Sequence, residues 1–460
     1  MKNFEYIRVA AAVPVIKVAN PMFNVKEIVS MVKIAYEDNK ATVILFPELC
    51  ITGYTCGDLF NQSVLIKGAE EALGVLLEQT KSINILIAVG MPVKADNQLF
   101  NCAVLLLKGK ILGAVPKTFV PNYNEFYEKR WFASSISRIS DEVNLCGQAV
   151  PLNENLLFKD SRSTLCIGFD ICEDLWVNIP PSSYHTMFGA NLILNLSASN
   201  EIIGKTDYRR DIVKLQSAKG IAAYVFSSAG QTESTTDLVF SGHSIIAENG
   251  IIVNENKFPE NSNIIYGDID LGKLGNDRIK LNTYMGRREN INYQYVNFEL
   301  GFSENDDLKR EVDPMPFVPS NLKERNKRCR EILNIQSTGL YQRLYKIAAK
   351  KAVVGISGGL DSTLALLVTV EAFKKLKLPM SNIVAVTMPG FGTTSRTYNN
   401  AITLMEELGV TTKEISIKDA VIQHFKDISH EMDVHDVTYE NSQARERTQI
   451  LMDIANQEEG

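Results

Sequence analysis

The sequence lacks the marks of secreted, membrane-spanning and metal-binding proteins. No apolar run is long enough to span a membrane, and the first residues contain no apolar core of a signal peptide. The seven cysteines are scattered and include no CxxC pair, which argues against both a disulfide framework and a zinc site. We therefore expect a cytoplasmic protein with neither a metal site nor a membrane partner.

The sequence also has no excess of positively charged residues. The chain has 48 Lys and Arg against 54 Asp and Glu, and the resulting net charge of −6 predicts no nucleic-acid partner. Its composition, with 45% hydrophobic and 22% charged residues, is typical of a soluble globular protein. Since 460 residues exceed one ordinary hydrophobic core, we expect two or three domains.

Two stretches of alternating apolar strands and helices predict an α/β fold class. The first covers residues 1–285 and the second covers residues 321–460. Between them, residues 286–320 lose this periodicity and gather charge and proline. Such a composition indicates a linker that can be ordered by wrapping on its neighbours.

Three polar residues of complementary chemistry each come after an apolar strand of the first domain. They are Glu48, Lys117 and Cys172, and strand ends of an α/β sheet converge on one rim. A desolvated carboxylate can take the proton of a thiol, and an ammonium can stabilise the anion formed when the thiolate attacks a carbonyl carbon. The set suffices for amide hydrolysis through a thioester.

Each of these residues alone has an ordinary explanation, as a surface carboxylate, a solvated lysine or a buried thiol. Histidine offers little as an alternative base, because His185 and His243 are the only histidines of this domain. Neither of them follows an apparent strand, so a papain-like Cys–His pair has little support.

The segments around the three residues resemble the signatures of the nitrilase (carbon–nitrogen hydrolase) superfamily, in its order and approximate spacing. The matching segments are residues 46–49 (FPEL), 116–117 (PK) and 170–174 (DICED). This resemblance implies an αββα sandwich with a Cys–Glu–Lys triad. In that triad Glu48 is the base, Lys117 the stabilising cation and Cys172 the nucleophile.

Two further segments resemble the glutaminase domain of glutamine-dependent NAD synthetases. They are residues 117–128 and residues 197–200, the latter followed by Lys205. The resemblance implies that four residues hold the glutamine: Tyr123, Glu173, Ser199 and Lys205. The α-carboxylate and α-ammonium of glutamine need a cation and polar acceptors, which suits these side chains. Taken alone, Tyr123 would be a packed aromatic residue and Lys205 a solvated helix residue.

A glycine turn after strand 352–356 and before helix 361–376 forms the second candidate site. Its backbone N–H groups and the hydroxyls of Ser357 and Ser362 can cradle phosphate. Walker A is excluded because no Gly-Lys-Ser/Thr follows, whereas the serine-hydrolase pattern G-x-S-x-G is satisfied. A purely structural turn is a third possibility.

The turn resembles the SGGxDS pyrophosphatase loop of ATP-adenylating amidotransferases. This resemblance assigns eight residues to ATP: Gly355, Ile356, Ser357, Gly358, Gly359, Leu360, Asp361 and Ser362. Residues 388–390 (MPG) continue it, and residues 440–447 are similar to the Glu-Asn-x-Gln-Ala-Arg signature of NAD synthetases. Asn441 and Arg445 are thereby implied to bind deamido-NAD, although a charged helix face would look the same.

Over nearly the whole chain, the resemblance is to bacterial glutamine-dependent NAD synthetases. It implies a nitrilase-like sandwich followed by a partial Rossmann-like parallel sheet with flanking helices. Glutamine hydrolysis would supply ammonia, and ATP with Mg²⁺, as a substrate complex, would activate deamido-NAD for conversion to NAD. The resemblance also implies a homo-oligomer and no tightly bound cofactor.

The synthetase part stops at Gly460, before the next strand expected of this family. We therefore expect an incomplete second domain and a chain that keeps at most the glutaminase half. Two other functions stay open at this point. One is a nitrilase-family amidase for another amide, and the other is a non-catalytic nucleotide-binding module.

Overall fold

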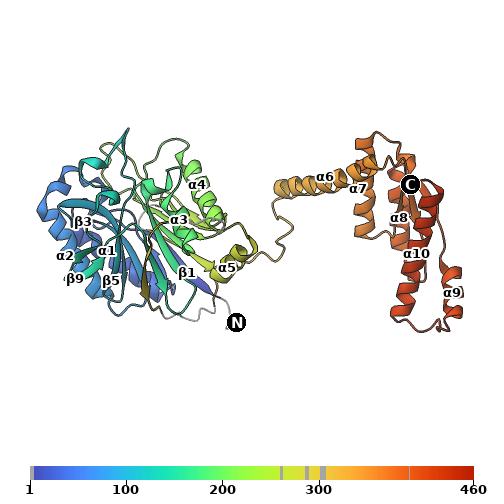
Figure 1. Cartoon of the computed structure of the whole chain (residues 1–460), viewed down its shortest axis with the longest axis horizontal. Helices are drawn as coiled ribbons and strands as arrows, with labels where there is room; N and C mark the ends of the chain where they lie inside the picture. Colours follow the sequence, from blue (N-terminus) through green and yellow to red (C-terminus); the bar gives the residue numbers. More distant parts are fainter. Residues whose placement is uncertain (1–4, 260–262, 285–289, 301–306, 393) are drawn as a thin grey trace. The chain divides into compact units, whose positions relative to one another are not determined.

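The computed structural model describes residues 5–259, 263–284, 290–300, 307–392 and 394–460. The chain divides into two compact units, Met1–Val312 and Asp313–Gly460 (Figure 1). Of the stretch predicted as a linker, residues 286–289 and 301–306 lie outside the described residues. Another part of that stretch forms a strand of the first unit, as given below.

Two mixed sheets form the centre of the first unit. The six-stranded sheet has the order β16-β1-β2-β3-β4-β5, and the seven-stranded sheet has the order β15-β14-β13-β12-β11-β10-β17. The strands of the first sheet are β1 (Tyr6–Val13), β2 (Val43–Leu45), β3 (Leu86–Ala95), β4 (Gln98–Leu107), β5 (Lys110–Pro116) and β16 (Asn263–Asp270). Those of the second are β10 (Leu156–Asp160), β11 (Cys166–Ile171), β12 (Leu192–Ser197), β13 (Ala223–Ser228), β14 (Ser244–Glu248), β15 (Ile251–Asn256) and β17 (Gln294–Phe298).

Side-chain alternation along the strands divides the core into layers. In β2, Val43 and Leu45 pack with β11 and β12 of the other sheet, whereas Ile44 packs with the helices on the opposite face. Helices cover the outer faces of the two sheets (Figure 1), which confirms the predicted αββα sandwich. These helices are α1 (Pro21–Glu37), α2 (Ser63–Thr80), α3 (Pro181–Met187) and α4 (Lys205–Gly220), and α5 (Leu271–Lys280) follows β16.

Helix α1 begins earlier than its apolar periodicity predicts. The apolar periodicity predicts a start at Asn24, but the side chain of Asn20 accepts a hydrogen bond from the backbone N–H of Phe23, and Pro21 takes the first helical position. Both are helix-start features that carry no apolar signal. The dipeptide Asn249-Gly250 is typical of a two-residue hairpin turn, and the structure has this turn between β14 and β15, with positive φ at both residues.

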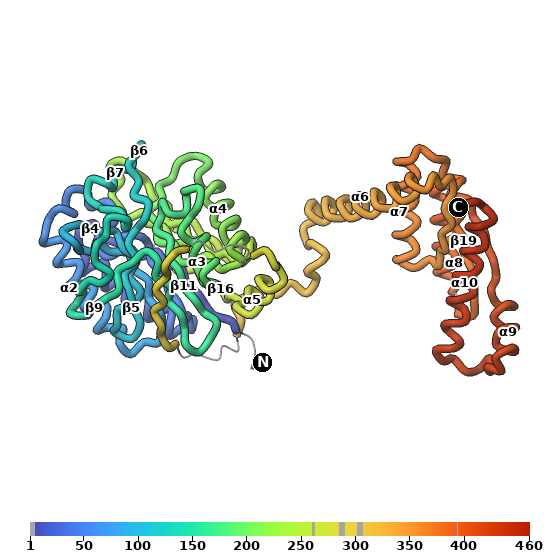
Figure 2. Tube along the Cα trace, viewed as in Figure 1, coloured from blue at the N-terminus to red at the C-terminus, as the bar shows by residue number. Residues whose placement is uncertain are grey.

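Short elements connect the strands of the first unit. The hairpin of β6 (Asn122–Tyr123) and β7 (Phe126–Tyr127) lies at the edge of the unit (Figure 2) and leads into a 3₁₀ turn, η2 (Glu128–Arg130). Two further 3₁₀ turns matter below: η1 (Tyr54–Asn61) and η4 (Cys172–Leu175). The remaining elements are η3 (Ser135–Ser137), β8 (Glu142–Leu145) and β9 (Gln148–Pro151).

The second unit is built on a parallel sheet of order β18-β19-β20. Residues of α6, α7 and α8 pack on one face of β19, and residues of α9 and α10 pack on the other, which confirms the predicted Rossmann-like arrangement. Its strands are β18 (Ala352–Gly355), β19 (Ile383–Thr387) and β20 (Thr411–Glu414). Its helices are α6 (Leu322–Lys346), α7 (Leu360–Leu376), α8 (Ser395–Glu407), α9 (Lys418–Asp427) and α10 (Val437–Gln457), with a 3₁₀ turn, η5 (Met380–Asn382).

Among the described helices of both units, none combines the length and the apolar character that a bilayer-crossing helix requires.

Candidate active site

The three predicted catalytic residues lie at the ends of strands that the two sheets bring together. Glu48 follows β2, Lys117 follows β5, and Cys172 follows β11 directly. The backbone N–H of Glu48 donates to the carbonyl of Ser197 at 3.3 Å, which joins the end of β2 to the end of β12 in the other sheet. All three side chains are buried.

Lys117 is held between two carboxylates. Its Nζ donates to Glu48 Oε1 at 2.7 Å, and to Glu128 Oε1 and Oε2 at 3.0 and 2.8 Å. Asn101 Nδ2 also donates to Glu48 Oε1, at 2.6 Å, whereas Glu48 Oε2 has no hydrogen-bond partner among the described residues. One oxygen of Glu48 is therefore fixed, and the other is free to accept a proton.

Burial and neighbouring charges shift the pKa values of this group. Burial raises the pKa of Glu48 to about 7, against the opposing effect of Lys117. Burial alone lowers the pKa of Lys117, but Glu128 and Glu48 outweigh it and raise that pKa well above its usual value. Burial also raises the pKa of the Cys172 thiol, with Glu48 adding to the shift and Lys117 opposing it.

The backbone at Cys172 is in the left-handed region, with φ of 43°. A residue other than glycine pays for this conformation in strain, which is typical of functional positions. Asp174 holds the turn in place: its Oδ2 accepts the Ile171 N–H at 3.0 Å, and its Oδ1 accepts the Phe119 N–H at 2.8 Å. Strand β11 runs on to Ile171, the residue directly before Cys172.

The segment that carries Glu48 lies directly against β3. A Cβ atom on Gly90 would lie 2.3 Å from the Leu49 nitrogen and 2.8 Å from the Glu48 Cα. No side chain fits there, so glycine permits the close approach of the two segments. The position of Glu48 thus depends on a residue that carries no catalytic chemistry.

Sequence reasoning missed three residues around the predicted triad, two of which contact it directly and one of which contacts it through Glu128. They are Tyr54, Asn101 and Glu128, and the Tyr54 hydroxyl donates to Glu128 Oε1 at 2.8 Å. Glu128 falls within the segment singled out for its resemblance to glutaminase domains. Its role could not be found there, because hairpin β6–β7 is what returns the chain to Lys117.

The four residues predicted to hold glutamine lie around the same centre. Tyr123 donates to both carboxylate oxygens of Glu173, at 2.9 and 3.0 Å. Lys205 Nζ donates to Asn200 Oδ1 and lies 5.4 Å from the Phe126 ring centroid. Burial lowers the pKa of Lys205, whereas a negative charge on Cys172 would raise it.

Ser199 differs from the other three in its burial, since Tyr123 is exposed and Glu173 and Lys205 are partly exposed. The Ser199 residue is buried, and its Oγ accepts a hydrogen bond from Arg209 Nη2 at 3.1 Å. Arg209 is fully buried and also donates to Glu201 and His243. The serine hydroxyl therefore keeps a free O–H donor, oriented by an arginine that sequence reasoning did not identify.

The glycine turn of the second unit has the strand–turn–helix context that the sequence predicts. The Ser357 and Ser362 hydroxyls lie 3.1 Å apart, and the Gly359 N–H donates to Ser357 Oγ at 3.3 Å. The positive φ of 79° falls on Gly358, where a Cβ would lie 1.9 Å from the Thr397 carbonyl oxygen. Because the strain falls on the glycine, the geometry does not support Ser357 as an elbow nucleophile.

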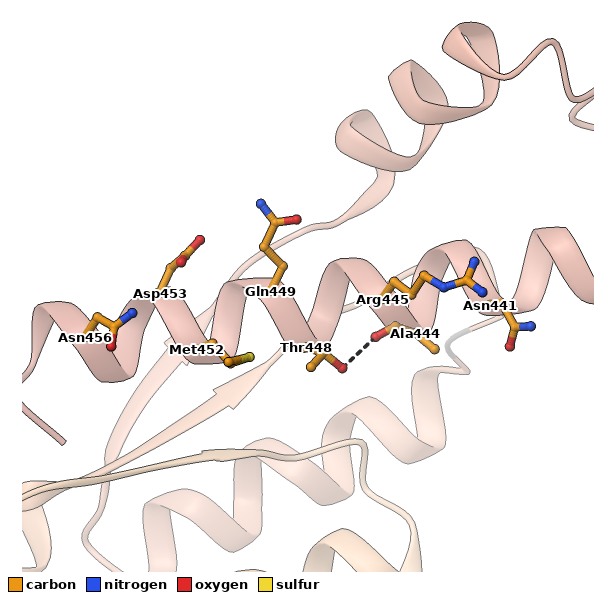
Figure 3. A pocket seen from close by; sticks show the side chains of 8 residues that line it. All are labelled: Asn441, Ala444, Arg445, Thr448, Gln449, Met452, Asp453 and Asn456. Carbon is orange, nitrogen blue, oxygen red and sulfur yellow. Dashed lines mark hydrogen bonds between the residues drawn. The ribbon is translucent and has the colours of Figure 1, made fainter. Parts of the chain in front are cut away.

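Asn441 and Arg445 lie on the exposed face of α10, along a hollow of about 500 Å³ (Figure 3). The opposite face of α10 is anchored, because Gln443 Oε1 accepts the Phe391 N–H at 3.1 Å and Arg447 Nε donates to the Met388 carbonyl at 3.2 Å. Within the described residues, no hydrogen bond joins Asn441 or Arg445 to the glycine turn. The hollow is lined by Asn441, Ala444, Arg445, Thr448, Gln449, Met452, Asp453 and Asn456.

Among the residues that the structure describes, no group of three or more His, Cys, Asp or Glu side chains is arranged to hold a metal ion.

Comparison with known proteins covers both units. A carbon–nitrogen hydrolase family model matches residues 8–279, and an NAD synthase model matches residues 332–460. The glutamine-dependent NAD(+) synthetase of Mycobacterium tuberculosis (strain ATCC 25618 / H37Rv) is 36% identical, over 99% of this chain and 68% of the relative. That of Mycobacterium leprae (strain TN) is 35% identical over the same shares. A crystal structure of a glutamine-dependent NAD(+) synthetase from Cytophaga hutchinsonii shares the fold, with a TM-score of 0.52 and 23% identity over 99% of this chain and 73% of that one.

Proposed function

Because the chain belongs to the family of glutamine-dependent NAD(+) synthetases, we propose that it hydrolyses glutamine at Cys172 and uses the ammonia to convert deamido-NAD to NAD. The observation that carries the first half is the buried contact of Lys117 with Glu48, whose second oxygen has no hydrogen-bond partner among the described residues and whose charge contributes to the raised pKa of the Cys172 thiol. The second half is supported by the glycine turn and by the match of residues 332–460 to NAD synthase.

In the glutaminase step, Glu48 takes the proton of the Cys172 thiol as the sulfur attacks the amide carbon of glutamine. The thiol needs this base because its raised pKa keeps it protonated at neutral pH. The Lys117 ammonium stabilises the oxyanion of the tetrahedral intermediate. Glu48 then returns the proton to the leaving nitrogen, which departs as ammonia, and activates the water that hydrolyses the thioester.

Glutamine is held by charge complementarity at its amino-acid end. Lys205 forms no salt bridge among the described residues, so its charge is available for the α-carboxylate, with the Ser199 hydroxyl as a further donor. Glu173 is available for the α-ammonium if the ligand shares or replaces its hydrogen bond from Tyr123. These contacts would place the amide end toward Cys172.

The second reaction belongs to the glycine turn and α10. Backbone N–H groups at the start of α7, with Ser357 and Ser362, suit the phosphates of ATP, and the Asp361 carboxylate and these hydroxyls are oxygen ligands of the type that Mg²⁺ prefers. Asn441 and Arg445 offer an amide and a guanidinium for deamido-NAD. The nicotinate carboxylate attacks the α-phosphorus of ATP and pyrophosphate leaves, after which ammonia attacks the acyl adenylate and displaces AMP to give NAD.

The cellular setting is part of the same proposal. A reducing cytoplasm is supported by the cysteines, all seven of which are free thiols. A homo-oligomer is supported by exposed apolar side chains on α6, among them Leu322 and Ile335. Size-exclusion chromatography with light scattering tests the assembly.

The test of the catalytic proposal compares Cys172→Ala with the wild-type chain. Ammonia release from glutamine should be lost in the variant, whereas ATP binding should be unchanged. Cys166→Ala is the matched control, because Cys166 is a buried thiol on the same strand, and it should keep the wild-type rate with a small loss of stability. Ammonia release by Cys172→Ala at the wild-type rate would contradict the mechanism.

NAD formation is measured in parallel with deamido-NAD, ATP and either glutamine or ammonium. The sequence alone leads us to expect at most the glutaminase half, whereas the match of residues 332–460 to NAD synthase supports both reactions. The proposal therefore predicts product with both nitrogen donors for the wild-type chain, and with ammonium alone for Cys172→Ala. Hydrolysis of glutamine without any ATP-dependent NAD formation would limit the chain to an amidase.

A further inference from the structure

We propose that Glu233 is a positioning residue for the first site, acting through Tyr54 on the Glu128–Lys117 pair. This inference rests on the proposed hydrolysis of glutamine at Cys172. Glu233 lies in the segment between β13 and β14, far in sequence from every predicted catalytic residue.

The Glu233 carboxylate caps the start of η1. Its Oε1 accepts the Tyr54 N–H at 2.7 Å, and its Oε2 accepts the Thr55 N–H at 3.0 Å and the Thr55 hydroxyl at 2.5 Å. The residue before this turn, Gly53, has no side chain and therefore cannot supply the cap itself. A carboxylate that is 7% exposed thus fixes the backbone from which the Tyr54 ring projects.

Tyr54 carries this constraint to the reacting groups. Its ring packs edge to face against Phe240, with centroids 5.8 Å apart, and its hydroxyl donates to Glu128 Oε1 at 2.8 Å. Burial, with Glu128, Glu48 and Cys172 nearby, raises the pKa of the Tyr54 phenol, so the hydroxyl stays a donor. Glu128 in turn holds Lys117 through both of its oxygens.

The consequence is a fixed position for the Lys117 ammonium. Losing the Tyr54 hydrogen bond leaves Glu128 Oε1 with Lys117 as its remaining donor among the described residues, and the carboxylate can then rotate and draw Lys117 away from Glu48. Stabilisation of the oxyanion requires that the Lys117 ammonium be placed to within a fraction of an ångström. In the proposed mechanism, Lys117 and Glu128 do not bind the amino-acid end of glutamine. The effect should therefore appear in kcat and leave KM unchanged.

A double-mutant cycle tests this route. Tyr54→Phe removes only the hydroxyl, and Glu233→Gln keeps the shape but turns an amide group toward backbone N–H donors. Each single variant should lower kcat for ammonia release by about tenfold or more, the size expected for a hydrogen bond to a charged group, with KM changed less than about twofold. The double variant should be no slower than the slower single variant.

The control is Glu248→Gln. Glu248 is also a buried carboxylate with several donors, among them Arg310 at 2.6 and 2.8 Å, but it contacts none of the catalytic residues. It should lower the melting temperature and leave kcat unchanged. If Glu233→Gln does not fold, Thr55→Val takes its place in the cycle, because it removes one of the donors to Glu233 at constant shape.

The outcomes separate this inference from the proposed function. A wild-type chain without Cys172-dependent ammonia release would overturn both. If the wild-type chain releases ammonia at the expected rate but the kcat losses of the two single variants multiply in the double variant, only the role of Glu233 is overturned. The same conclusion follows if Glu233→Gln lowers kcat no more than Glu248→Gln does.

Discussion

Three ionisable side chains share the buried centre of the first site with the Cys172 thiol. Lys117 contributes one positive charge, while Glu48 and Glu128 are the two acids in contact with it. A thiolate would add a further negative charge to a group in which the acids already outnumber the base, at a cost that burial increases. The nucleophile therefore rests as a thiol and gives up its proton only as it attacks.

The pH dependence of glutamine hydrolysis should follow Glu48. Because burial raises its pKa to about 7 from the usual 4.5, the base is mostly protonated, and so inactive, between about pH 5 and 7, where an ordinary glutamate is mostly ionised. We expect kcat/KM to fall as the pH drops through about 7, and not only below about 5. Initial rates of ammonia release between those limits measure it.

Glu48→Gln isolates this effect. The substitution keeps the shape of the side chain but removes its basicity. The loss of base catalysis should lower kcat by about 10²–10⁴-fold and abolish the fall in rate as the pH drops through about 7. Glu248→Gln changes a buried glutamate outside the site and should keep the fall in rate at low pH. A rate within a factor of about two of wild type for Glu48→Gln would rule out proton transfer by this residue.

At the scale of elements, the central strands were predictable because both faces of each are buried. β12 and β13 are mainly apolar runs, and the apolar patterns at residues 192–196 and 221–227 of the sequence predict them to within two residues. Strand β16 was not predicted. It pairs with β1 across some 250 residues of chain, and nothing in its local composition signals that partner.

The candidate site divides in the same way. Glu48, Lys117 and Cys172 could be found because each directly follows an apolar strand. Glu128 and Tyr54 could not, since both depend on turns that bring them back to Lys117 from outside the sheets. The sequence thus indicates residues placed by regular strands, whereas residues placed by irregular turns need the folded chain.

Gly90 shows how much the site depends on the contact between elements. Gly90→Ala would force a Cβ to within 2.3 Å of the backbone of Leu49, so β3 and the Glu48 segment must separate. We expect a loss of about 1–3 kcal/mol in the free energy of unfolding and a lower kcat, measured by urea denaturation and ammonia release.

Gly74→Ala is the matched control for that substitution. Gly74 lies in α2, where a Cβ would meet only Cys146 Sγ at 3.9 Å, an ordinary contact. Alanine should stabilise that helix by up to about 1 kcal/mol and leave kcat unchanged. Equal stabilities for the two alanine variants would contradict the close approach at Gly90.

At the scale of the whole molecule, the two candidate sites belong to units that each have their own hydrophobic core. The chemistry explains why one chain carries both. Ammonia released into water at neutral pH is protonated and loses the lone pair that attacks an acyl adenylate. One chain keeps the site that releases ammonia and the site that uses it at a ratio of one to one. Because each unit has its own hydrophobic core, each site can fold without the other's ligand.

Substitutions in the glycine turn should therefore act on one site only. Asp361→Ala and Ser362→Ala remove a carboxylate and a hydroxyl at the start of α7, and each should weaken binding of ATP with Mg²⁺ by about tenfold, measured by calorimetric titration. Ammonia release from glutamine should stay at the wild-type rate, because the altered residues share no core with Cys172. Glu371→Ala is the control, since it removes an exposed carboxylate farther along α7 and should leave both measurements unchanged. Unchanged ATP affinity in Asp361→Ala and Ser362→Ala would remove the turn from nucleotide binding, and a parallel loss of ammonia release would show that the two units are coupled.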